Sequence, residues 1–385
     1  MSLSAGTTAL GGSVAAGYQS VRDLLERESH ADPEYSFQLA VYRGGELVVD
    51  LHGGEGIAAD SLMVPFSVSK NAIGFSIAVL VDRGLLDLDA RVADYWPEFG
   101  SHGKQDVRVS ELLSHQVGLP EAIPTLSDEE VAVAAVGAAR LVDQLPWWRP
   151  GAAFGYHGVT IGVLASELVR RITGRTLQEF FDAEIRAPRS LDFYLGIGPE
   201  LESRVVELQP VLPQAGAAEP IPFSRTPGQI GRAVFANVTI PRPPDEQAAH
   251  LKWQRSVGAP AVYATVSALG IAGLFAEAVA GVTGEPFVSP QTIARMAQTQ
   301  VVGIDQVIGI GRSYGIVFQK PTPNLAFGGF RAFGHDGAGG ALGFHDPATG
   351  ISLGYTVRRT PPPGGADARA LAVAALVQRI ELSRA

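Results

Sequence analysis

The chain has 385 residues, of which 46% are hydrophobic and 18% charged, so it can bury a substantial core and is not expected to be disordered. Its formal net charge is −9 and it has no basic run, which argues against nucleic acid or an anionic membrane surface as a partner. Cysteine is absent, which excludes disulfides, thiol nucleophiles and thiolate metal sites.

Two further features bear on localisation. The N-terminal stretch MSLSAGTTALGGSVAAG has neither the charged region nor the apolar region of a signal peptide. The longest apolar stretch, residues 261–276, is shorter than the roughly twenty residues that a membrane span needs, and it contains two glycines. We therefore predict a buried helix there, and we expect a cytoplasmic protein with no membrane partner.

The first part of the chain predicts a helix, a hairpin and a second, apolar helix that carries Ser67. The hairpin follows from two strands of high β propensity on either side of a glycine turn. In chain order, the ranges are 21–27 for the helix, 37–42 and 47–51 for the strands, and 67–84 for the apolar helix.

The middle of the chain is mostly helical in its pattern. An amphipathic helix over 161–173 is stopped by Gly174, and Thr176 with Glu179 forms a capping box that begins the next helix. Residues 198–255 are rich in proline and glycine, so we predict long loops that could wall a cleft.

The C-terminal part returns to strands and ends on a long helix. The predicted strands cover 314–319, 340–344 and 351–358, and the helix covers 366–384. Strands at both chain ends with short connections predict an α+β fold whose antiparallel sheet is built from both termini. We divide it into a sheet domain of residues 1–84 and 255–385 and a helical region of residues 85–254 with cleft-forming loops.

Lys70 is the most informative residue. It is one of four lysines, and no other charged side chain occurs from Leu62 to Val81. An ammonium on an apolar helix is costly unless it is paired or deprotonated. Ser67 lies three residues earlier on the same helix face, so Lys70 could act as its general base.

The pattern S-x-x-K alone is weak, because Ser101-His-Gly-Lys104 fits it as well. That second copy lies in a polar loop with glycine, and we interpret it as a solvated turn. The alternative without a catalytic role is that Lys70 buries only its aliphatic stem and keeps its amine in water.

Two other segments carry candidate chemistry. Residues 147–160 (WWRPGAAFGYHGVT) deliver Tyr156 in a tight turn just before a helix. A phenol beside an ammonium can lose its proton more easily, and it could relay protons between the serine, a leaving group and water. Residues 333–340 (FGHDGAGG) lead into a strand, and their glycines would let a substrate approach the backbone closely, as an oxyanion hole requires.

With Leu112–Pro120 (LLSHQVGLP), these segments resemble the serine β-lactamase and penicillin-binding-protein superfamily. The most similar branch is the class C β-lactamase-like esterases, or family VIII carboxylesterases, of the EstA type. The resemblance spans residues 37–358. It implies an esterase on the β-lactamase/transpeptidase-like fold, with a small-molecule ester as its substrate and no metal or organic cofactor.

The resemblance also implies roles for individual residues. Ser67 would be the nucleophile, and Lys70 with Tyr156 would activate it and protonate the leaving alkoxide. The backbone N–H groups of Ser67 and Ala338 would form the oxyanion hole. His335, followed by Asp336 and Gly337, would stand where β-lactamases carry Lys-Thr-Gly.

Two departures from the β-lactamase pattern favour a neutral ester over an antibiotic. The position two after Tyr156 is Gly158 rather than asparagine, and His335 replaces the lysine of Lys-Thr-Gly. A neutral imidazole binds a carboxylate less strongly than an ammonium does. We expect short-acyl or hydrophobic esters and a mostly uncharged cleft.

Three alternatives stay open from the sequence. One is a β-lactamase or D-alanyl-D-alanine peptidase, another is an acyltransferase, and the third is a binding protein that kept the fold and lost turnover. His115 is interpreted as a bonded structural residue, and His157 is expected to point away from Tyr156, with a position in the cleft lining left open. The pairs and spacings typical of metal sites are absent from the sequence.

Overall fold

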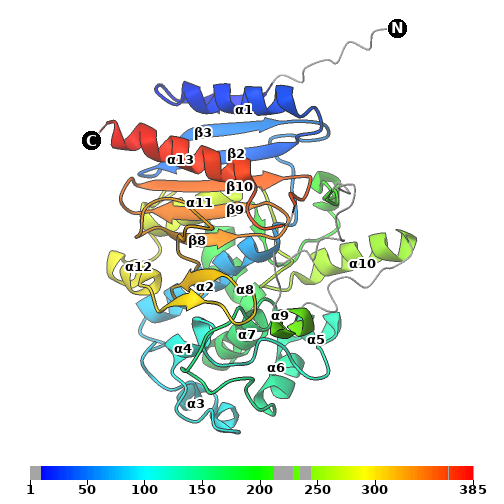
Figure 1. Cartoon of the computed structure of the whole chain (residues 1–385), viewed down its shortest axis with the longest axis vertical. Coiled ribbons are helices and arrows are strands. Elements are labelled where there is room, and N and C mark those ends of the chain that lie inside the picture. Colours follow the sequence, from blue (N-terminus) through cyan, green and yellow to red (C-terminus); the bar gives the residue numbers. More distant parts are fainter. Residues whose placement is uncertain (1–9, 212–228, 235–243, 363, 385) are drawn as a thin grey trace.

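The protein is described by a computed structural model that covers residues 10–211, 229–234, 244–362 and 364–384. Its largest sheet has six antiparallel strands in the order β1-β3-β2-β10-β9-β8, and it joins both ends of the chain (Figure 1). The central pair is β2 with β10, in which Phe37 faces Val357 and Arg43 faces Ile351. The strands are β1 Gly11–Val14, β2 Phe37–Arg43, β3 Glu46–Gly53, β8 Phe333–Asp336, β9 Leu342–Asp346 and β10 Ile351–Val357.

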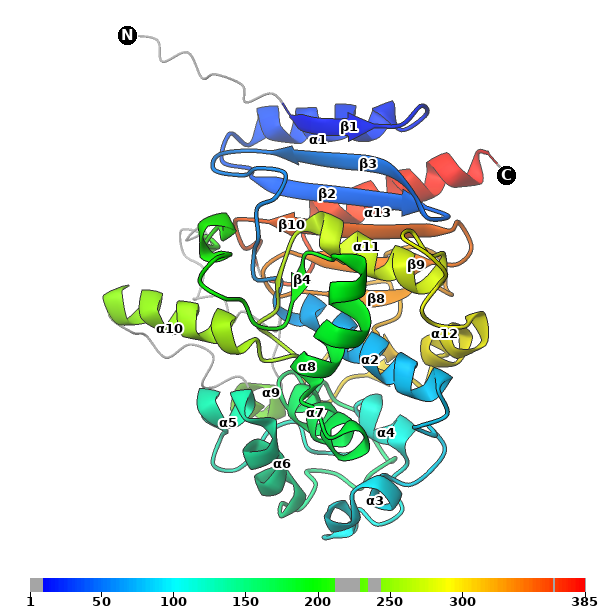
Figure 2. The same cartoon turned by 180° about the vertical axis from the view of Figure 1, so that it is seen from behind.

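Helices cover both faces of this sheet. Helices α1 (Gln19–Ala31) and α13 (Ala368–Leu382) lie in front of it in Figure 1, whereas α11 (Ala268–Val279) crosses the opposite face in Figure 2. The strands are therefore buried on both sides, and all seven residues of β10 are buried. This double burial explains why β10 is continuously apolar or small rather than alternating.

The rest of the chain packs around helix α2 (Lys70–Asp82), which follows a 3-10 turn over Phe66–Ser69. Eleven residues of α2 are buried, from Lys70 to Leu80. A helix that is apolar all round is expected to lie inside a core. Its neighbours are α7 (Thr160–Thr173), α8 (Leu177–Phe181) and α12 (Pro290–Ala297).

Shorter elements complete the described part. The remaining helices are α3 Val92–Tyr95, α4 Val109–Leu113, α5 Asp128–Ala132, α6 Ala134–Val142, α9 Gln229–Val234 and α10 Pro244–Val257. Two small antiparallel pairs lie outside the main sheet: β4 Phe193–Tyr194 with β5 Thr265–Val266, and β6 Val301–Ile304 with β7 Gly311–Tyr314.

The α+β fold with an antiparallel sheet from both chain ends is confirmed. So are the first hairpin and the helix that ends at Gly174, whose φ of 74° is the left-handed cap expected of glycine. The strand predicted over 314–319 is wrong. Only Tyr314 of that range lies in β7, and Val317 has a φ of 67°, which no strand allows.

Two other expectations need correction. Part of the segment predicted as loops, residues 198–255, is the helix α10, while residues 212–228 and 235–243 lie outside the described part. Lys104 is not solvated: it is fully buried, and its Nζ donates to Val142 O and Gln144 O at 2.9 Å each. The second S-x-x-K is thus a structural tether.

Within the described part, no helix combines the length and the apolar character needed to cross a bilayer. The division of the chain at residues 84 and 255 stays a prediction.

Candidate active site

Ser67 lies in the 3-10 turn that precedes α2, and only 8% of its surface is exposed. Phe66, directly before it, has a φ of 48°, a left-handed conformation that is uncommon for a bulky residue. The turn is tied to a distant segment by Ser69, whose Oγ donates to Phe66 O at 2.5 Å and accepts from the backbone N–H of Ala264 at 3.0 Å. The surrounding structure therefore fixes the position of Ser67.

Lys70 is the first residue of α2, and none of its surface is exposed. Its Nζ lies 3.0 Å from Ser67 Oγ and donates to the carbonyl of Ala261 at 2.8 Å. Burial lowers the pKa of Lys70 well below its usual value, and the opposing attraction of Asp336 is the smaller effect. Burial therefore favours the neutral amine, which is the form that can take a proton.

Tyr156 approaches Ser67 from the other side, and its hydroxyl donates to Ser67 Oγ at 2.7 Å. Lys70 Nζ lies 5.0 Å from the centre of the Tyr156 ring. Burial raises the pKa of Tyr156, although the bond to Ser67 opposes the rise. The expectation of an accessible phenolate is therefore wrong, because burial favours the protonated phenol.

These contacts define where the proton of Ser67 points. Ser67 Oγ accepts a hydrogen bond from Tyr156, and the lone pair of a neutral Lys70 is free to accept one. Ser67 can then donate its own proton only towards Lys70. This is the arrangement that an activated serine needs.

Asp305 holds Tyr156 in place, and the sequence analysis missed it. Its Oδ1 accepts from the backbone N–H groups of Tyr156, Val307 and Ile308 at 2.8–3.0 Å, and its Oδ2 accepts from the Tyr314 hydroxyl at 3.0 Å. Asp305 is the only charged residue between positions 299 and 311. Lys70 was identified because it is the one charged residue in a long uncharged segment, and the same criterion would have identified Asp305.

The glycine-rich segment lies against the Ser67 turn. His335 belongs to β8, and Gly337 and Ala338 form the turn that follows. A Cβ on Gly337 would lie 2.0 Å from the carbonyl oxygen of Pro65, so only glycine permits this approach. Ala338 is 8% exposed. The backbone of residues 337–338 is therefore next to the turn that carries Ser67.

His335 faces Tyr156, with 5.9 Å between the ring centres. Its Nδ1 is 2.7 Å from the carbonyl of Asp336, so the proton of a neutral ring lies on Nδ1. Burial, aided by Lys70, lowers the pKa of His335 to about 3. Its Nε2 is buried, has no protein partner among the described residues and can only accept a hydrogen bond.

The other histidines near the site have structural contacts. His115 Nδ1 accepts from the backbone N–H of His157 at 3.1 Å, and its ring packs on Tyr314 with 4.5 Å between ring centres. His157 bonds through both ring nitrogens to the backbone of Leu119 and Gly155. His115 was interpreted from the sequence as a bonded structural residue, and its contacts agree with that interpretation.

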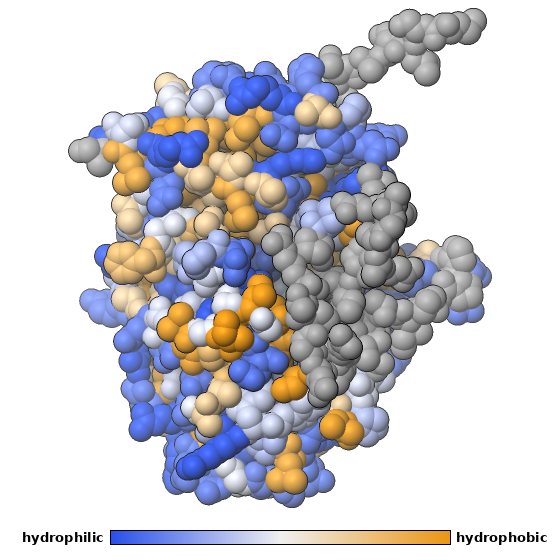
Figure 3. All heavy atoms as spheres, in the orientation of Figure 1, coloured by the Kyte–Doolittle hydropathy of each residue, from blue (hydrophilic) through white to orange (hydrophobic). Residues whose placement is uncertain are grey.

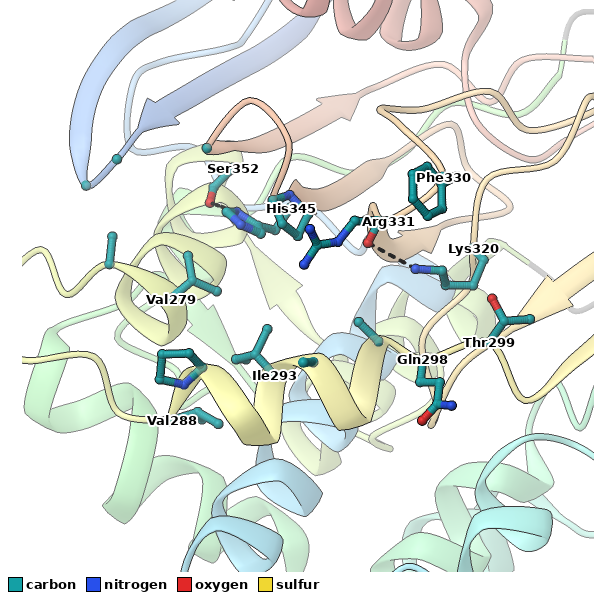
Figure 4. Close-up of a pocket in the computed structure, with 18 residues that line it drawn as sticks. Val279, Val288, Ile293, Gln298, Thr299, Lys320, Phe330, Arg331, His345 and Ser352 are labelled. Atoms are coloured by element: carbon teal, nitrogen blue, oxygen red, sulfur yellow. Dashed lines mark hydrogen bonds between the residues drawn. The ribbon is translucent and has the colours of Figure 1, made fainter.

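A separate cavity of about 600 Å3 lies between α12 and the sheet, and its lining includes none of Ser67, Lys70 and Tyr156 (Figure 4). It contains a serine–histidine contact, Ser352 Oγ to His345 Nδ1 at 2.9 Å. These two residues are opposite partners in the β9–β10 ladder, so an ordinary cross-strand pair explains the contact. The cavity is not the candidate active site.

Among the described residues, no cluster of three or more histidine, aspartate or glutamate side chains could hold a metal ion.

Known proteins with similar sequences and structures share this arrangement of the chain. The family model described as Beta-lactamase matches residues 22–378. The esterase/beta-lactamase LipL of Mycobacterium tuberculosis is 28% identical over 340 residues, which cover 84% of this chain and 77% of that protein.

Two solved structures cover nearly the whole chain. EstA from Arthrobacter nitroguajacolicus Rue61a has a TM-score of 0.88 and 37% sequence identity, and the match covers 97% of this chain and 100% of EstA. A family VIII carboxylesterase has a TM-score of 0.82 and 29% identity, with 96% and 99% covered.

Proposed function

Because the chain belongs to the beta-lactamase family, we propose that it is a carboxylesterase that works through an acyl-serine intermediate on Ser67. The observation that carries this proposal is the position of Ser67 Oγ, within 3.0 Å of the buried Lys70 amine and 2.7 Å of the Tyr156 hydroxyl. The esterases among its relatives support the same reaction.

In the first step, Ser67 Oγ attacks the ester carbonyl while Lys70 takes its proton. The negative charge moves to the carbonyl oxygen, where the backbone N–H groups of Ser67 and Ala338 stabilise it. The start of a helix favours negative charge here, because Ser67 precedes the thirteen residues of α2.

In the second step, the carbon–oxygen bond to the alcohol breaks. Tyr156 gives its proton to the leaving oxygen and regains one from the Lys70 ammonium, so both groups return to their starting states. Water then attacks the acyl carbon while Lys70 takes one of its protons, the bond from that carbon to Ser67 Oγ breaks, Ser67 regains the proton from Lys70, and the acid is released.

A β-lactamase activity is the second candidate, because the mycobacterial relative is named esterase/beta-lactamase. Against it, Gly158 and His335 stand where antibiotic-hydrolysing relatives carry an amide and an ammonium. We place ester hydrolysis first for this reason. We also propose a cytoplasmic location, which suits the absence of cysteine.

The test is a panel of p-nitrophenyl esters and the cephalosporin nitrocefin, with intact-protein mass spectrometry. We expect cleavage of short-acyl esters, a transient mass increase equal to the acyl group, and slower turnover of nitrocefin. Ser67→Ala should abolish ester cleavage and the mass increase. Activity that survives in this variant would remove Ser67 as the nucleophile.

A further inference from the structure

Arg312 lies on the face of β7 that is turned towards the candidate active site. Tyr314, two residues later on the same strand face, stacks on Tyr156 with 6.2 Å between ring centres. In β6, Val302 and Ile304 are 74% and 63% exposed, so the opposite face of the hairpin is turned outward. Apolar side chains gather at mid-height of this side of the molecule in Figure 3, over the β6–β7 hairpin that is gold in Figure 1.

The hairpin leaves space beside Arg312. Its cross-strand neighbour is Gly303, which has no side chain. A Cβ placed on Gly303 would meet only the ring of Phe154, at 3.5 Å. Arg312 therefore has no side chain opposite it on the neighbouring strand.

The donors of Arg312 are not used by the described part of the protein. Its Nε and Nη1 are buried and have no hydrogen-bond partner there. Asp305 and Asp336 affect the pKa of Tyr156, as Arg312 does, but their carboxylates accept hydrogen bonds from backbone N–H groups. Buried guanidinium N–H groups without partners are costly, and a ligand carboxylate would satisfy two of them at once.

The charge of Arg312 reaches the reacting groups. Burial raises the pKa of Tyr156, and Arg312 is among the groups that oppose this rise. Burial lowers the pKa of His335 to about 3, and Lys70 and Arg312 contribute to this shift. His335 is neutral with a bare acceptor nitrogen, so it cannot bind an anion, and Arg312 is the cation suited to that role.

We propose that Arg312 binds a carboxylate on the alcohol part of the ester substrate. The leaving oxygen must lie at the Tyr156 hydroxyl to receive its proton, and Arg312 lies on the Tyr156 side of the site. The inference rests on the proposed esterase function and corrects the expectation of an uncharged cleft. The preferred substrates are esters with a small neutral acyl group and an alcohol that carries a carboxylate.

The test compares 4-acetoxybenzoate with phenyl acetate, which share the acyl group and differ by one carboxylate. In Arg312→Gln, the ratio of kcat/KM for the acid to that for the neutral ester should fall about tenfold or more, mainly through KM. Arg312→Lys should retain part of the ratio because it keeps the charge. Arg295→Gln is the matched control: Arg295 is a half-exposed arginine paired with Asp89, and its loss should leave the ratio unchanged.

An unchanged ratio in Arg312→Gln would overturn the inference, and if both activities fall equally, the role of Arg312 is structural. A measurement on the wild type needs no variant, since benzoate should bind more tightly than benzamide in calorimetry. Equal binding of the two would also overturn it. Loss of phenyl acetate cleavage in Ser67→Ala tests the esterase function separately, so failure of one proposal is distinguishable from failure of the other.

Discussion

Lys70 is a lysine that the fold keeps completely out of water. The contacts available to its amine are a hydroxyl and a backbone carbonyl, both uncharged. Removing an ammonium from water costs several kcal/mol, which two neutral contacts do not return. The neutral amine is the state in which this residue fits, and it is also the state in which it can take a proton.

Loss of either partner of Ser67 should reduce turnover without unfolding the protein. We expect Lys70→Met and Tyr156→Phe each to lower kcat/KM for a p-nitrophenyl ester by about 10²–10⁴-fold. Thermal unfolding should show that both variants remain folded. A variant that retains near wild-type activity would show that its side chain takes no part in proton transfer.

The lowered pKa of Lys70 also affects stability. In the unfolded chain Lys70 binds a proton below its ordinary pKa, whereas the folded state resists that proton, so the wild type loses stability as the pH falls from about 10 towards the folded pKa. Lys70→Met has no such group. As the pH falls through this window, the free energy of unfolding of Lys70→Met should therefore rise relative to that of the wild type by up to about 1.4 kcal/mol per pH unit.

Denaturant unfolding of both proteins between pH 7 and pH 10 measures this difference. A constant difference across the range would mean that Lys70 is charged in the folded state.

Charged residues within apolar stretches could be identified from the sequence, but the residues that they contact in the fold could not. Lys70 is recognisable because it interrupts a long apolar stretch, and Ser67 is a neighbour in the same turn. Asp305 also interrupts an apolar stretch, but the backbone N–H of Tyr156 to which it bonds lies 149 residues away along the chain, and only the fold brings Arg312 near the same tyrosine. Only the packing of the hairpin on the Tyr156 loop shows what they do.

At the scale of elements, the Asp305 carboxylate joins the Tyr156 loop to the β6–β7 hairpin, together with a backbone hydrogen bond from the Gln306 N–H to Phe154 O. Asp305→Ala would leave buried backbone N–H groups and the Tyr314 hydroxyl without an acceptor. We expect it to lower the free energy of unfolding by about 2–5 kcal/mol and to reduce activity strongly.

Asp305→Asn is the matched control, because its amide oxygen can still accept from the same N–H groups. It should stay much closer to the wild type in both unfolding and ester hydrolysis. If alanine and asparagine behave alike, Asp305 does not position the loop.

The turn after β8 must approach the Ser67 turn closely. Gly337→Ala places a methyl group against the Pro65 carbonyl, so the turn has to move and the Ala338 N–H moves with it. We expect kcat/KM to fall about 100-fold or more, the effect of losing an oxyanion donor. Gly284→Ala is the control, since a Cβ there meets nothing within 4 Å. Full activity of Gly337→Ala would exclude this turn from the oxyanion hole.

Elements with local signals were predictable, and those fixed by distant contacts were not. The helix ending at Gly174 and the helix begun by Thr176 carry their own caps. Val317, in contrast, adopts its left-handed backbone where its N–H bonds to Leu113 O, a contact that no local pattern shows. Strand β8 was likewise hidden in a segment rich in glycine.

At the scale of the whole molecule, the C-terminal helix α13 stabilises a sheet that also supports the active site. Its buried residues pack in one core with α1 and the strands, and its Glu381 accepts a hydrogen bond from the Tyr18 hydroxyl at 2.5 Å. The buried residues of α13 that enter this core are Ala370, Val373, Ala374 and Val377.

Deletion of residues 368–385 should therefore abolish folding and activity, although it removes no residue of the site. Circular dichroism and ester hydrolysis would measure both losses. Leu382→Ala is the control, because Leu382 is 62% exposed and its change should cost within about 0.5 kcal/mol. A truncated protein that hydrolyses esters would show that the sheet stands without this helix.

The pairing of β2 with β10 has a consequence for synthesis on the ribosome. Residues 37–43 emerge early, yet their strand partner, residues 351–357, is translated more than 300 residues later. Until then β2 presents an unpaired edge, which other nascent chains can join. We therefore expect this edge to be a point of association between nascent chains until residues 351–357 have been made.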